Sequence, residues 1–381
     1  MNLRLCKCVI VVTVLLLYYG CNDDTVTISH RGIVRSGGAN VELLDSVVLQ
    51  MDSASMRGNF FMKDDTLCFA DVFFGKVFQF DLSDGQMLSA LFGKGKARDE
   101  ISDFMFMYPV NNGDGSVFFI DSSNYFYTSA DLLHIKKHGM IDFGWGENSQ
   151  KDLASPSVYN IMEMTDFDFK VTQINDSVCI MPVSLINRKL GSLVSDRYKD
   201  GRIFGALNMK TMKVENVFCG FPEIYSHKPT NLFEFFSYDM SGDTIFVNHA
   251  VDSTIYVYKY PDKLLFTMGY ECKQIDRGYS IGYDLDPSVL LEDVDHVGVS
   301  TQLYYMKDQG LLLRVLNGGK RYGNRFYLQI YNKDCDLVAE VDVPPFFKCV
   351  GHTGDIIYGV NLIPIERNGE EKFYLYKLKI E

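Results

Sequence analysis

Five polar residues stand at comparable positions along the chain, each at the end of a short apolar run. They are Asp71, Asp121, His249, Arg314 and Asn361. Carboxylate, amide and imidazole groups are ordinary ligands of Ca²⁺ and Zn²⁺, and a metal held by them can activate water or polarise a carbonyl. One interpretation of this pattern is therefore a metal-dependent hydrolase or lyase.

Two features of the same set argue against a cation. Pro182 occupies the corresponding position of a further apolar run, and Arg314 would place a positive charge beside the metal. The favoured interpretation is that these groups bond the backbone of their own loops and that no cofactor binds, with Ca²⁺ or Zn²⁺ as the alternative. In a third interpretation, Arg314 and Arg188 recognise a carboxylate or an acidic glycan.

The glycine- and lysine-rich loop FGKGKARDE, from Phe92 to Glu100, does not fit a phosphate-binding loop. Such a loop needs Gly-Lys followed by Ser or Thr at the start of a helix, so that backbone N–H groups and the helix dipole meet the anion. Arg98 and Glu100 are expected to brace the loop instead. They remain candidates for a ligand-binding face.

Aromatic residues mark the long stretches between apolar runs. Trp145, the only tryptophan, and Tyr159, Tyr225 and Tyr279 are examples. Their rings can stack on sugars or pack against a partner, and packing within the loops is the alternative. No Ser-His-Asp or Cys-His set can be assigned, because such groups meet in space rather than along the chain.

The elements that must position these residues repeat along the chain. Each unit has two apolar strands joined by a short polar turn, then a third strand after a loop and a fourth after a tight turn. The six first turns lie at 63–65, 111–115, 175–176, 241–243, 307–310 and 352–355. Asn, Asp and Gly suit such turns. Four strands repeated six times predict an all-β fold, a six-bladed β-propeller.

The last unit has no fourth strand of its own. Residues 41–50 (VELLDSVVLQ) form an additional strand before the first unit, and pairing it with the last blade would close the ring and cover an exposed edge. Residues 41–381 are therefore expected to form a single propeller domain. A β-sandwich or two barrels are the alternatives.

The two rims of such a ring differ in loop length. Turns between first and second and between third and fourth strands are short, whereas the other connections include 138–165, 184–202, 220–232 and 270–297. Long loops on a rigid scaffold are where binding usually occurs. We therefore expect a protein or glycan partner on the long-loop face.

The N-terminus has the pattern of an export signal. Arg4 and Lys7 precede an apolar run that ends at Gly20-Cys21, which resembles a bacterial lipobox. Residues 1–20 are expected to be a signal peptide, Cys21 the lipidated residue and 21–40 a tether to the short-turn rim. A plain secretory signal or a transmembrane anchor are the alternatives.

The expected location is the bacterial cell envelope. An outer-membrane lipoprotein fits this pattern, and the acids after Cys21 suggest exposure at the cell surface. Without residues 1–20, 35 basic residues face 49 acidic ones, a net charge of about −14 that argues against nucleic acid as a partner. The six remaining cysteines lie among apolar residues and are expected to stay free.

The sequence resembles the TolB-like six-bladed propeller lipoproteins in four features taken together. These are the lipobox, the closing strand, the six units and the loop with Gly93, Gly95 and Glu100. The Pro-Gly step typical of that family's loop is absent here. The resemblance implies a fold and a location, and it assigns no reaction. We expect a non-catalytic binding or scaffold protein, with a lactonase-like metal enzyme or a carbohydrate-binding lipoprotein as alternatives.

Overall fold

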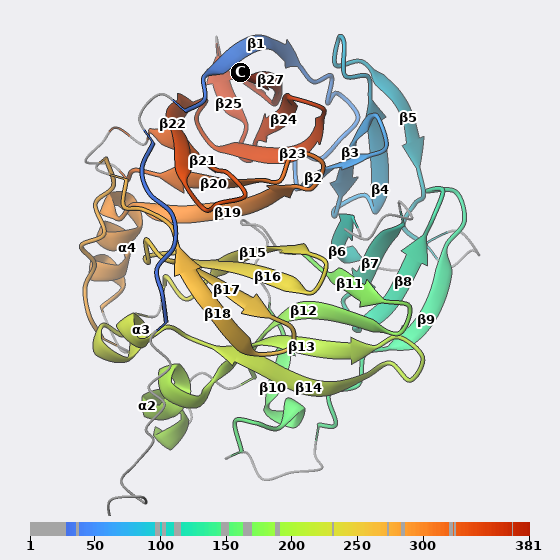
Figure 1. The fold of residues 1–381 in the computed structure, drawn as a ribbon. Coiled ribbons are helices and arrows are strands. Elements are labelled where there is room, and N and C mark those ends of the chain that lie inside the picture. The colour runs from blue at the N-terminus through green and yellow to red at the C-terminus, as the bar shows by residue number, and fades with distance from the viewer. Residues whose placement is uncertain are drawn as a thin grey trace, which may run out of the picture.

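A computed structural model shows six sheets that follow one another around a ring (Figure 1). It describes residues 28–35, 38–95, 100, 104–109, 116–145, 152–162, 170–186, 191–230, 232–272, 274–282, 286–319, 323, 325–367 and 369–381. Each sheet is antiparallel and forms one blade, with its first strand next to the ring centre. The predicted six-bladed β-propeller is confirmed.

Each blade follows the predicted strand order. Blade 1 contains β2 (Gly58–Lys63), β3 (Thr66–Asp71), β4 (Lys76–Phe80) and β5 (Met87–Leu91). Blade 2 contains β6 (Phe104–Pro109), β7 (Val117–Asp121), β8 (Tyr125–Ser129) and β9 (Lys136–Met140). Blade 3 contains β11 (Thr172–Asn175), β12 (Val178–Leu185), β13 (Arg202–Asn208) and β14 (Lys213–Gly220), with β10 (Tyr159–Ile161) as an additional strand on β12.

The second half of the ring continues in the same way. Blade 4 contains β15 (Phe236–Ser241), β16 (Thr244–His249), β17 (Ile255–Lys259) and β18 (Lys263–Met268). Blade 5 contains β19 (Val299–Met306), β20 (Leu311–Asn317), β21 (Phe326–Tyr331) and β22 (Leu337–Val343). Blade 6 contains β23 (Phe347–Thr353), β24 (Ile356–Asn361), β27 (Tyr374–Ile380) and β1 (Val41–Val48), and the hairpin β25 (Ile365–Arg367) and β26 (Glu370–Lys372) projects from it.

The ring closes as the sequence predicts. β1 pairs antiparallel with β27, with Val41 opposite Ile380 and Val48 opposite Tyr374. The first strand of the chain thus becomes the outer strand of the last blade. Because it covers the edge of β27, the N- and C-terminal parts of the domain hold each other in place.

Apolar side chains between neighbouring blades form the core. The largest cluster joins blades 2, 3 and 4 and includes Phe126, Tyr159, Phe204 and Tyr238. The cysteines of the described chain are buried within such clusters and free, as predicted: Cys68, Cys179, Cys219, Cys272, Cys335 and Cys349. Burial raises the pKa of the Cys68 and Cys179 thiols to about 12, so both behave as small apolar groups.

Hydrogen bonds also join one blade to the next at the outer edge of the ring. The Asp142 N–H, just after β9, donates to Met212 O in the turn before β14 at 2.8 Å. The Gln50 N–H, just after β1, donates to Gly85 O in the turn before β5 at 3.0 Å. The end of a fourth strand therefore contacts the next blade's outer turn.

The N-terminal belt (residues 28–35 and 38–40) lies along the edges of blades 4 and 5. Arg31 N–H donates to Thr267 O of β18 at 2.8 Å, and Arg35 N–H donates to Leu337 O of β22 at 2.9 Å. The belt joins blade 4, blade 5 and the closing strand in blade 6 (Figure 1). The chain therefore enters the domain at the outer edge of blade 4, and not directly at the short-turn rim beside β1.

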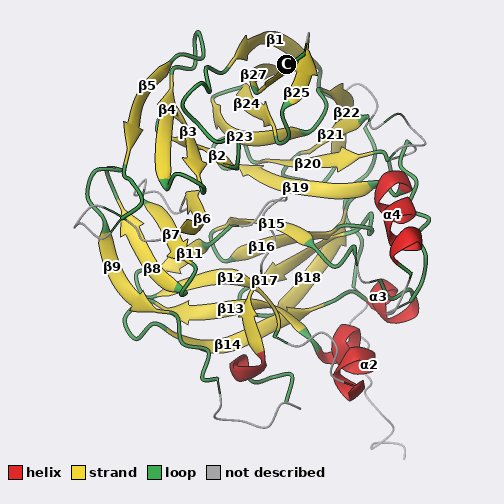
Figure 2. Ribbon diagram, turned by 180° about the vertical axis from the view of Figure 1, so that it is seen from behind, coloured by secondary structure: helices red, strands yellow, loops and turns green. Residues whose placement is uncertain are grey.

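Helices occur in the long connections of blades 3 and 4. α2 (Gly191–Asp200) lies between β12 and β13, α3 (Glu223–His227) follows β14, and α4 (Pro287–His296) precedes β19. A short 3₁₀ helix, η1 (Pro156–Val158), precedes β10. α2, α3 and α4 gather on one side of the ring (Figure 2). Within the described residues, no helix is long and apolar enough to cross a membrane.

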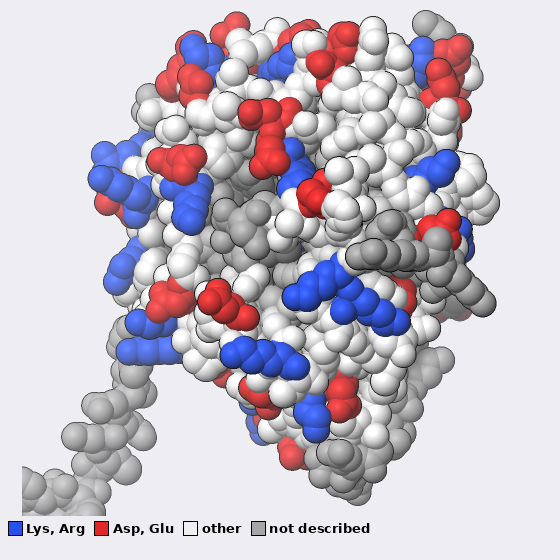
Figure 3. All heavy atoms as spheres, turned by 90° about the vertical axis from the view of Figure 1, so that its right-hand side faces the viewer, with Lys and Arg blue, Asp and Glu red and all other residues white. Residues whose placement is uncertain are grey.

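The opposite side of the molecule carries charges of both signs. Lys and Arg side chains alternate there with Asp and Glu over several blades, and neither sign forms one continuous patch (Figure 3).

Candidate functional site

Asp71 closes the loop that follows its own strand. Its carboxylate accepts the N–H groups of Phe73 at 3.0 Å and Phe74 at 2.9 Å, and the hydroxyl of Ser55 at 2.7 Å. The side chain is 1 % exposed. Its oxygens are thus engaged by the loop between β3 and β4 and by the segment before β2.

Asp121 and Asn361 have the same role in blades 2 and 6. The Asp121 carboxylate accepts the Tyr125 N–H at 2.9 Å and the Tyr127 hydroxyl at 2.8 Å. The Asn361 side chain accepts the Tyr374 N–H at 2.6 Å and donates to backbone carbonyls of its loop. These strand-end groups hold local backbone, which is the arrangement favoured from the sequence.

The structure does not bring these residues into one constellation. Asp71, Asp121 and Asn361 belong to three different blades, and each bonds its own loop. Among the residues that the structure describes, no group of three or more His, Cys, Asp or Glu side chains could hold a metal ion.

His249 ends β16 inside an aromatic cage. Its ring centroid lies 5.9 Å from that of Phe221, 5.5 Å from Tyr225 and 5.7 Å from Phe236. Burial lowers the pKa of His249 to about 4, so the ring is neutral near pH 7. Its Nδ1 atom is buried and has no hydrogen-bond partner among the described residues.

Arg314 lies wholly inside the joint between blades 4 and 5. Its guanidinium donates from Nε to the Gln329 side chain at 2.8 Å, from Nη1 to Ser253 O, and from Nη2 to Tyr270 O. It also lies 5.6 Å from the centroid of the Tyr331 ring. Burial lowers the pKa of Arg314, and no carboxylate of the described chain bonds it directly.

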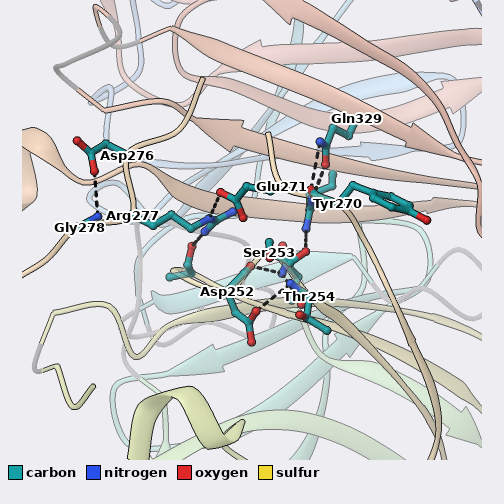
Figure 4. Close-up of polar contacts among 12 residues, drawn as sticks. Asp252, Ser253, Thr254, Tyr270, Glu271, Asp276, Arg277, Gly278 and Gln329 are labelled. Carbon is teal, nitrogen blue, oxygen red and sulfur yellow. Dashed lines mark hydrogen bonds and ion pairs between the residues drawn. The ribbon is translucent and has the colours of Figure 1, made fainter. Parts of the chain in front are cut away.

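A second arginine, which the sequence analysis did not single out, lies beside Arg314. Arg277 Nε donates to Glu271 at 2.9 Å, and its Nη1 donates to Ala250 O at 3.0 Å (Figure 4). The positive charge of Arg277 contributes to the lowered pKa of Arg314. The loop that carries Arg277 connects β18 to β19, so the pair lies at the long-loop end of the joint.

A small cavity lies under α2, between blades 3 and 4. Buried Arg197 of α2 forms an ion pair with buried Glu234, and the Tyr198 hydroxyl also donates to Glu234. Arg202 and Phe221 complete the polar and apolar walls. The cavity measures about 20 Å³, room for a single water molecule.

A larger hollow of about 510 Å³ lies beside the closing strand. It is lined by the segment after β1, including Leu49 and Met51, and by Glu370 and Phe373 at the end of the β25–β26 hairpin. Glu370 forms an ion pair with Lys372 at 2.5 Å. This hollow combines apolar walls with an acidic rim.

The loop aromatics divide into buried and exposed rings. Tyr159 and Tyr225 are fully buried. Trp145 is 43 % exposed, stacks on Phe143 with centroids 5.4 Å apart, and donates its indole N–H to Tyr159 O at 2.8 Å. The Tyr279 hydroxyl donates to Lys228 O at 2.7 Å. Among these four rings, Trp145 presents the most accessible surface.

The remaining candidates lie in the less described part of the chain. Glu100 is exposed, and its carboxylate lies against Gly95, where a Cβ would overlap it. Cys21, Arg98 and Arg188 lie outside the described residues. Their expected roles stay predictions.

Comparisons with solved structures identify the same fold. A member of the DUF4221 family from Bacteroides vulgatus matches 91 % of this chain and 99 % of its own, with a TM-score of 0.66 and 10 % identity. A Bacteroides fragilis protein assigned as exported matches 93 % and 99 %, with a TM-score of 0.52 and 13 % identity. No family model and no curated sequence matches the chain. At these identities the likeness concerns the fold alone.

Proposed function

We propose that the protein is a lipid-anchored extracytoplasmic binding protein that holds a protein partner on its long-loop face. Cys21 would carry the lipid, and an outer-membrane location in a bacterial envelope would follow. The export assignment of the Bacteroides fragilis neighbour supports this compartment. The lipobox, the closing strand and the loop around Gly93 and Gly95 favour a TolB-like lipoprotein.

The distribution of exposed apolar side chains carries this proposal. The connections that form the long-loop face expose Phe73, Phe74, Trp145, Ile186, Ile281, Leu291, Val294 and Ile363. In the short turns of the described chain, Leu133 is the comparable residue. Apolar groups gathered on one face of a monomer usually mark an interaction surface. A non-catalytic role accounts for this face without a metal or a nucleophile.

Helix α4 offers the sharpest test of this face. Leu291 and Val294 lie one turn apart on it and are 69 % and 57 % exposed. Replacing both by serine should leave the fold intact and remove apolar contact area. If they lie in the centre of the interface, the loss is about 2 kcal/mol, or roughly thirty-fold in affinity.

The measurement is capture from envelope extracts, quantified for each variant. Leu88→Ser combined with Leu133→Ser is the matched control, because both leucines are exposed but lie away from the long loops. A protein captured by the wild type and the control but lost with Leu291→Ser/Val294→Ser supports the proposal. Loss with the control variant alone would place the interface elsewhere.

Trp145 favours a second candidate, carbohydrate binding. Its indole is fixed by the Phe143 ring and by Tyr159 O, so a sugar could stack on it at little entropic cost. Trp145→Ala should then abolish binding on a glycan array, while Tyr279→Phe should not. Equal glycan signals for the wild type and Trp145→Ala would remove this candidate.

A further inference from the structure

Four buried polar atoms at the joint between blades 4 and 5 have no hydrogen-bond partner among the described residues. They are Ser237 Oγ, Asn248 Oδ1, Ser300 Oγ and Arg277 Nη2. The two serines and the asparagine are at most 1 % exposed. Buried polar atoms are nearly always paired in proteins, so several unpaired ones in one joint indicate that something polar belongs between them.

Ser237 and Asn248 point from blade 4 toward blade 5. They are direct cross-strand partners on β15 and β16, so their side chains lie on the same side of the sheet. Asp239 lies two residues beyond Ser237, and its carboxylate accepts the Tyr305 N–H of β19 at 2.8 Å. Side chains alternate along a strand, so Ser237 shares the side that faces blade 5.

Ser300 points back from blade 5 toward blade 4. It pairs with Leu316 of β20, which shares a side with Arg314 two residues before it. Arg314 reaches Ser253 O and Tyr270 O in the loops of blade 4. The unpaired hydroxyls therefore face each other across the joint.

The guanidinium of Arg277, which carries the unpaired Nη2, adjoins Ser300 at the start of β19. Ala250 O accepts both the Ser300 N–H at 2.8 Å and Arg277 Nη1 at 3.0 Å. The guanidinium and the start of β19 thus meet at one carbonyl. Glu271 bonds Nε of the same guanidinium, and Nη2 has no hydrogen-bond partner among the described residues.

Charge distinguishes an anion from water as the missing group. Arg277 and Arg314 are neighbouring cations. Glu271, which is half-exposed, forms an ion pair with Arg277. Water could satisfy the N–H and hydroxyl groups, but with Glu271 bonded to Arg277 it would leave the second positive charge, that of buried Arg314, without a bonded carboxylate. A carboxylate would satisfy both the charge and the hydrogen bonds.

We propose that this joint binds a carboxylate that carries a hydrogen-bond donor beside it. Arg277 Nη2 and the hydroxyls of Ser237 and Ser300 donate to the carboxylate oxygens, and Asn248 Oδ1 accepts the neighbouring donor of the ligand. Sugar acids and peptide C-termini share this chemistry, through a hydroxyl in one and an amide N–H in the other. The inference rests on the proposed function, because Arg277 and Glu271 lie in the connection between β18 and β19, which belongs to the long-loop face.

Calorimetric titration of the detergent-purified full chain tests the site. Glucuronate and triglycine are the probes, and glucose and triglycine amide are their neutral counterparts. One carboxylate should bind and its neutral counterpart should not, which also tells the two sources apart. Arg277→Gln should weaken binding at least tenfold, and Ser300→Ala several-fold.

Arg325→Gln is the matched control, because Arg325 lies in a long loop of blade 5 but is exposed. It should bind the probe as the wild type does. If Arg277→Gln does not fold, Arg277→Lys, which keeps the charge and loses the planar fork, should still weaken binding. No binding of either carboxylate, or equal binding by wild type and Arg277 variants, would overturn the proposal.

The two proposals fail separately. Loss of partner capture with Leu291→Ser/Val294→Ser, combined with silent carboxylate titrations, would leave the binding face and remove the carboxylate site. Carboxylate binding without any captured protein would keep the site and point to a small ligand.

Discussion

His249 is a buried histidine whose neutrality the fold requires. The unfolded chain gives a histidine a pKa near 6.5, whereas the pKa of His249 in the folded protein is about 4. Between these values the unfolded state binds a proton that the folded state does not. The free energy of unfolding therefore falls as the pH drops from about 6.5 toward 4.

His249→Phe should remove this part of the pH dependence. Going from pH 7.5 to pH 5 should cost the wild type about 2 kcal/mol through this one residue, and the variant none of it. Phenylalanine also suits a cage of Phe221, Tyr225 and Phe236 and leaves no unpaired Nδ1. Urea unfolding at both pH values measures the difference.

The control is His227→Phe, a change at an exposed histidine of α3. It should keep the pH dependence of the wild type. If His249→Phe also keeps it in full, the buried imidazole is not the group that titrates.

At the scale of single residues, the sequence predicts the local role of a side chain better than which distant residues it contacts. Asp71 and Asp121 stand where an apolar strand ends, and a carboxylate there caps the following turn; this was the favoured interpretation. Arg277 lies in the connection between β18 and β19, Ser300 lies on β19, and no local pattern connects them. Their meeting depends on packing between sheets, which sequence spacing does not report.

The N-terminal belt is the element that makes the joint of blades 4 and 5 different from the others. Asp336, in the outer turn of blade 5, accepts the Ile33 N–H at 2.9 Å and forms an ion pair with Arg35. The Tyr270 hydroxyl, from the loop after β18, donates to Gly32 O. The belt thus lies at the outer edge of this joint, where blades 2 and 3, and blades 6 and 1, bond each other directly.

Gly32→Ala should release this belt. Gly32 has φ of +90°, and a Cβ there would lie 2.0 Å from Cys335 O. The strain should cost about 1–3 kcal/mol locally, so the Arg31, Arg35 and Leu337 amides should exchange roughly ten- to hundred-fold faster. Hydrogen exchange measured by mass spectrometry follows these segments.

Gly93→Ala is the matched control, because a Cβ at Gly93 meets open space. Exchange in the belt should then equal that of the wild type. Unchanged exchange in Gly32→Ala would mean that the belt contributes no protection at this joint.

Strands were predictable as elements, whereas the helices were missed. Along the chain, apolar runs alternate with turn residues, so the number and order of the strands could be counted from the sequence. α4 did have a readable start, since Asp286 caps the helix by accepting the Ser288 N–H and Pro287 follows it. α3 spans only five residues, and a helix of that length depends on packing against the ring for its stability.

At the scale of the whole molecule, the pairing of β1 with β27 closes the ring. The sequence predicts that β1 joins the last blade, because the sixth unit has no fourth strand of its own and residues 41–50 form a strand that belongs to no unit. The belt before it was expected to be a simple tether, since its residues are polar and contain glycine. Its hydrogen bonds are made through the backbone, so side-chain composition did not reveal them.

The belt also orients the ring if Cys21 is lipidated. The chain between Cys21 and Ile28 can span at most ~25 Å, and Ile28 lies beside β18 at the outer edge of blade 4. We therefore expect the ring to stand with blade 4 toward the membrane and blade 1, on the opposite side, away from it. Both rims would then remain open to partners.

Fluorescent labels on two exposed leucines of outer strands test this orientation. Leu265→Cys lies on β18 of blade 4, and Leu88→Cys lies on β5 of blade 1. The native cysteines of the described chain are buried, so labelling should be selective. With the lipidated protein in vesicles, a headgroup quencher should quench the label at 265 several-fold more than the label at 88. Stronger quenching at 88 would contradict the edge-on orientation, and equal quenching of both would mean that the belt detaches at the membrane.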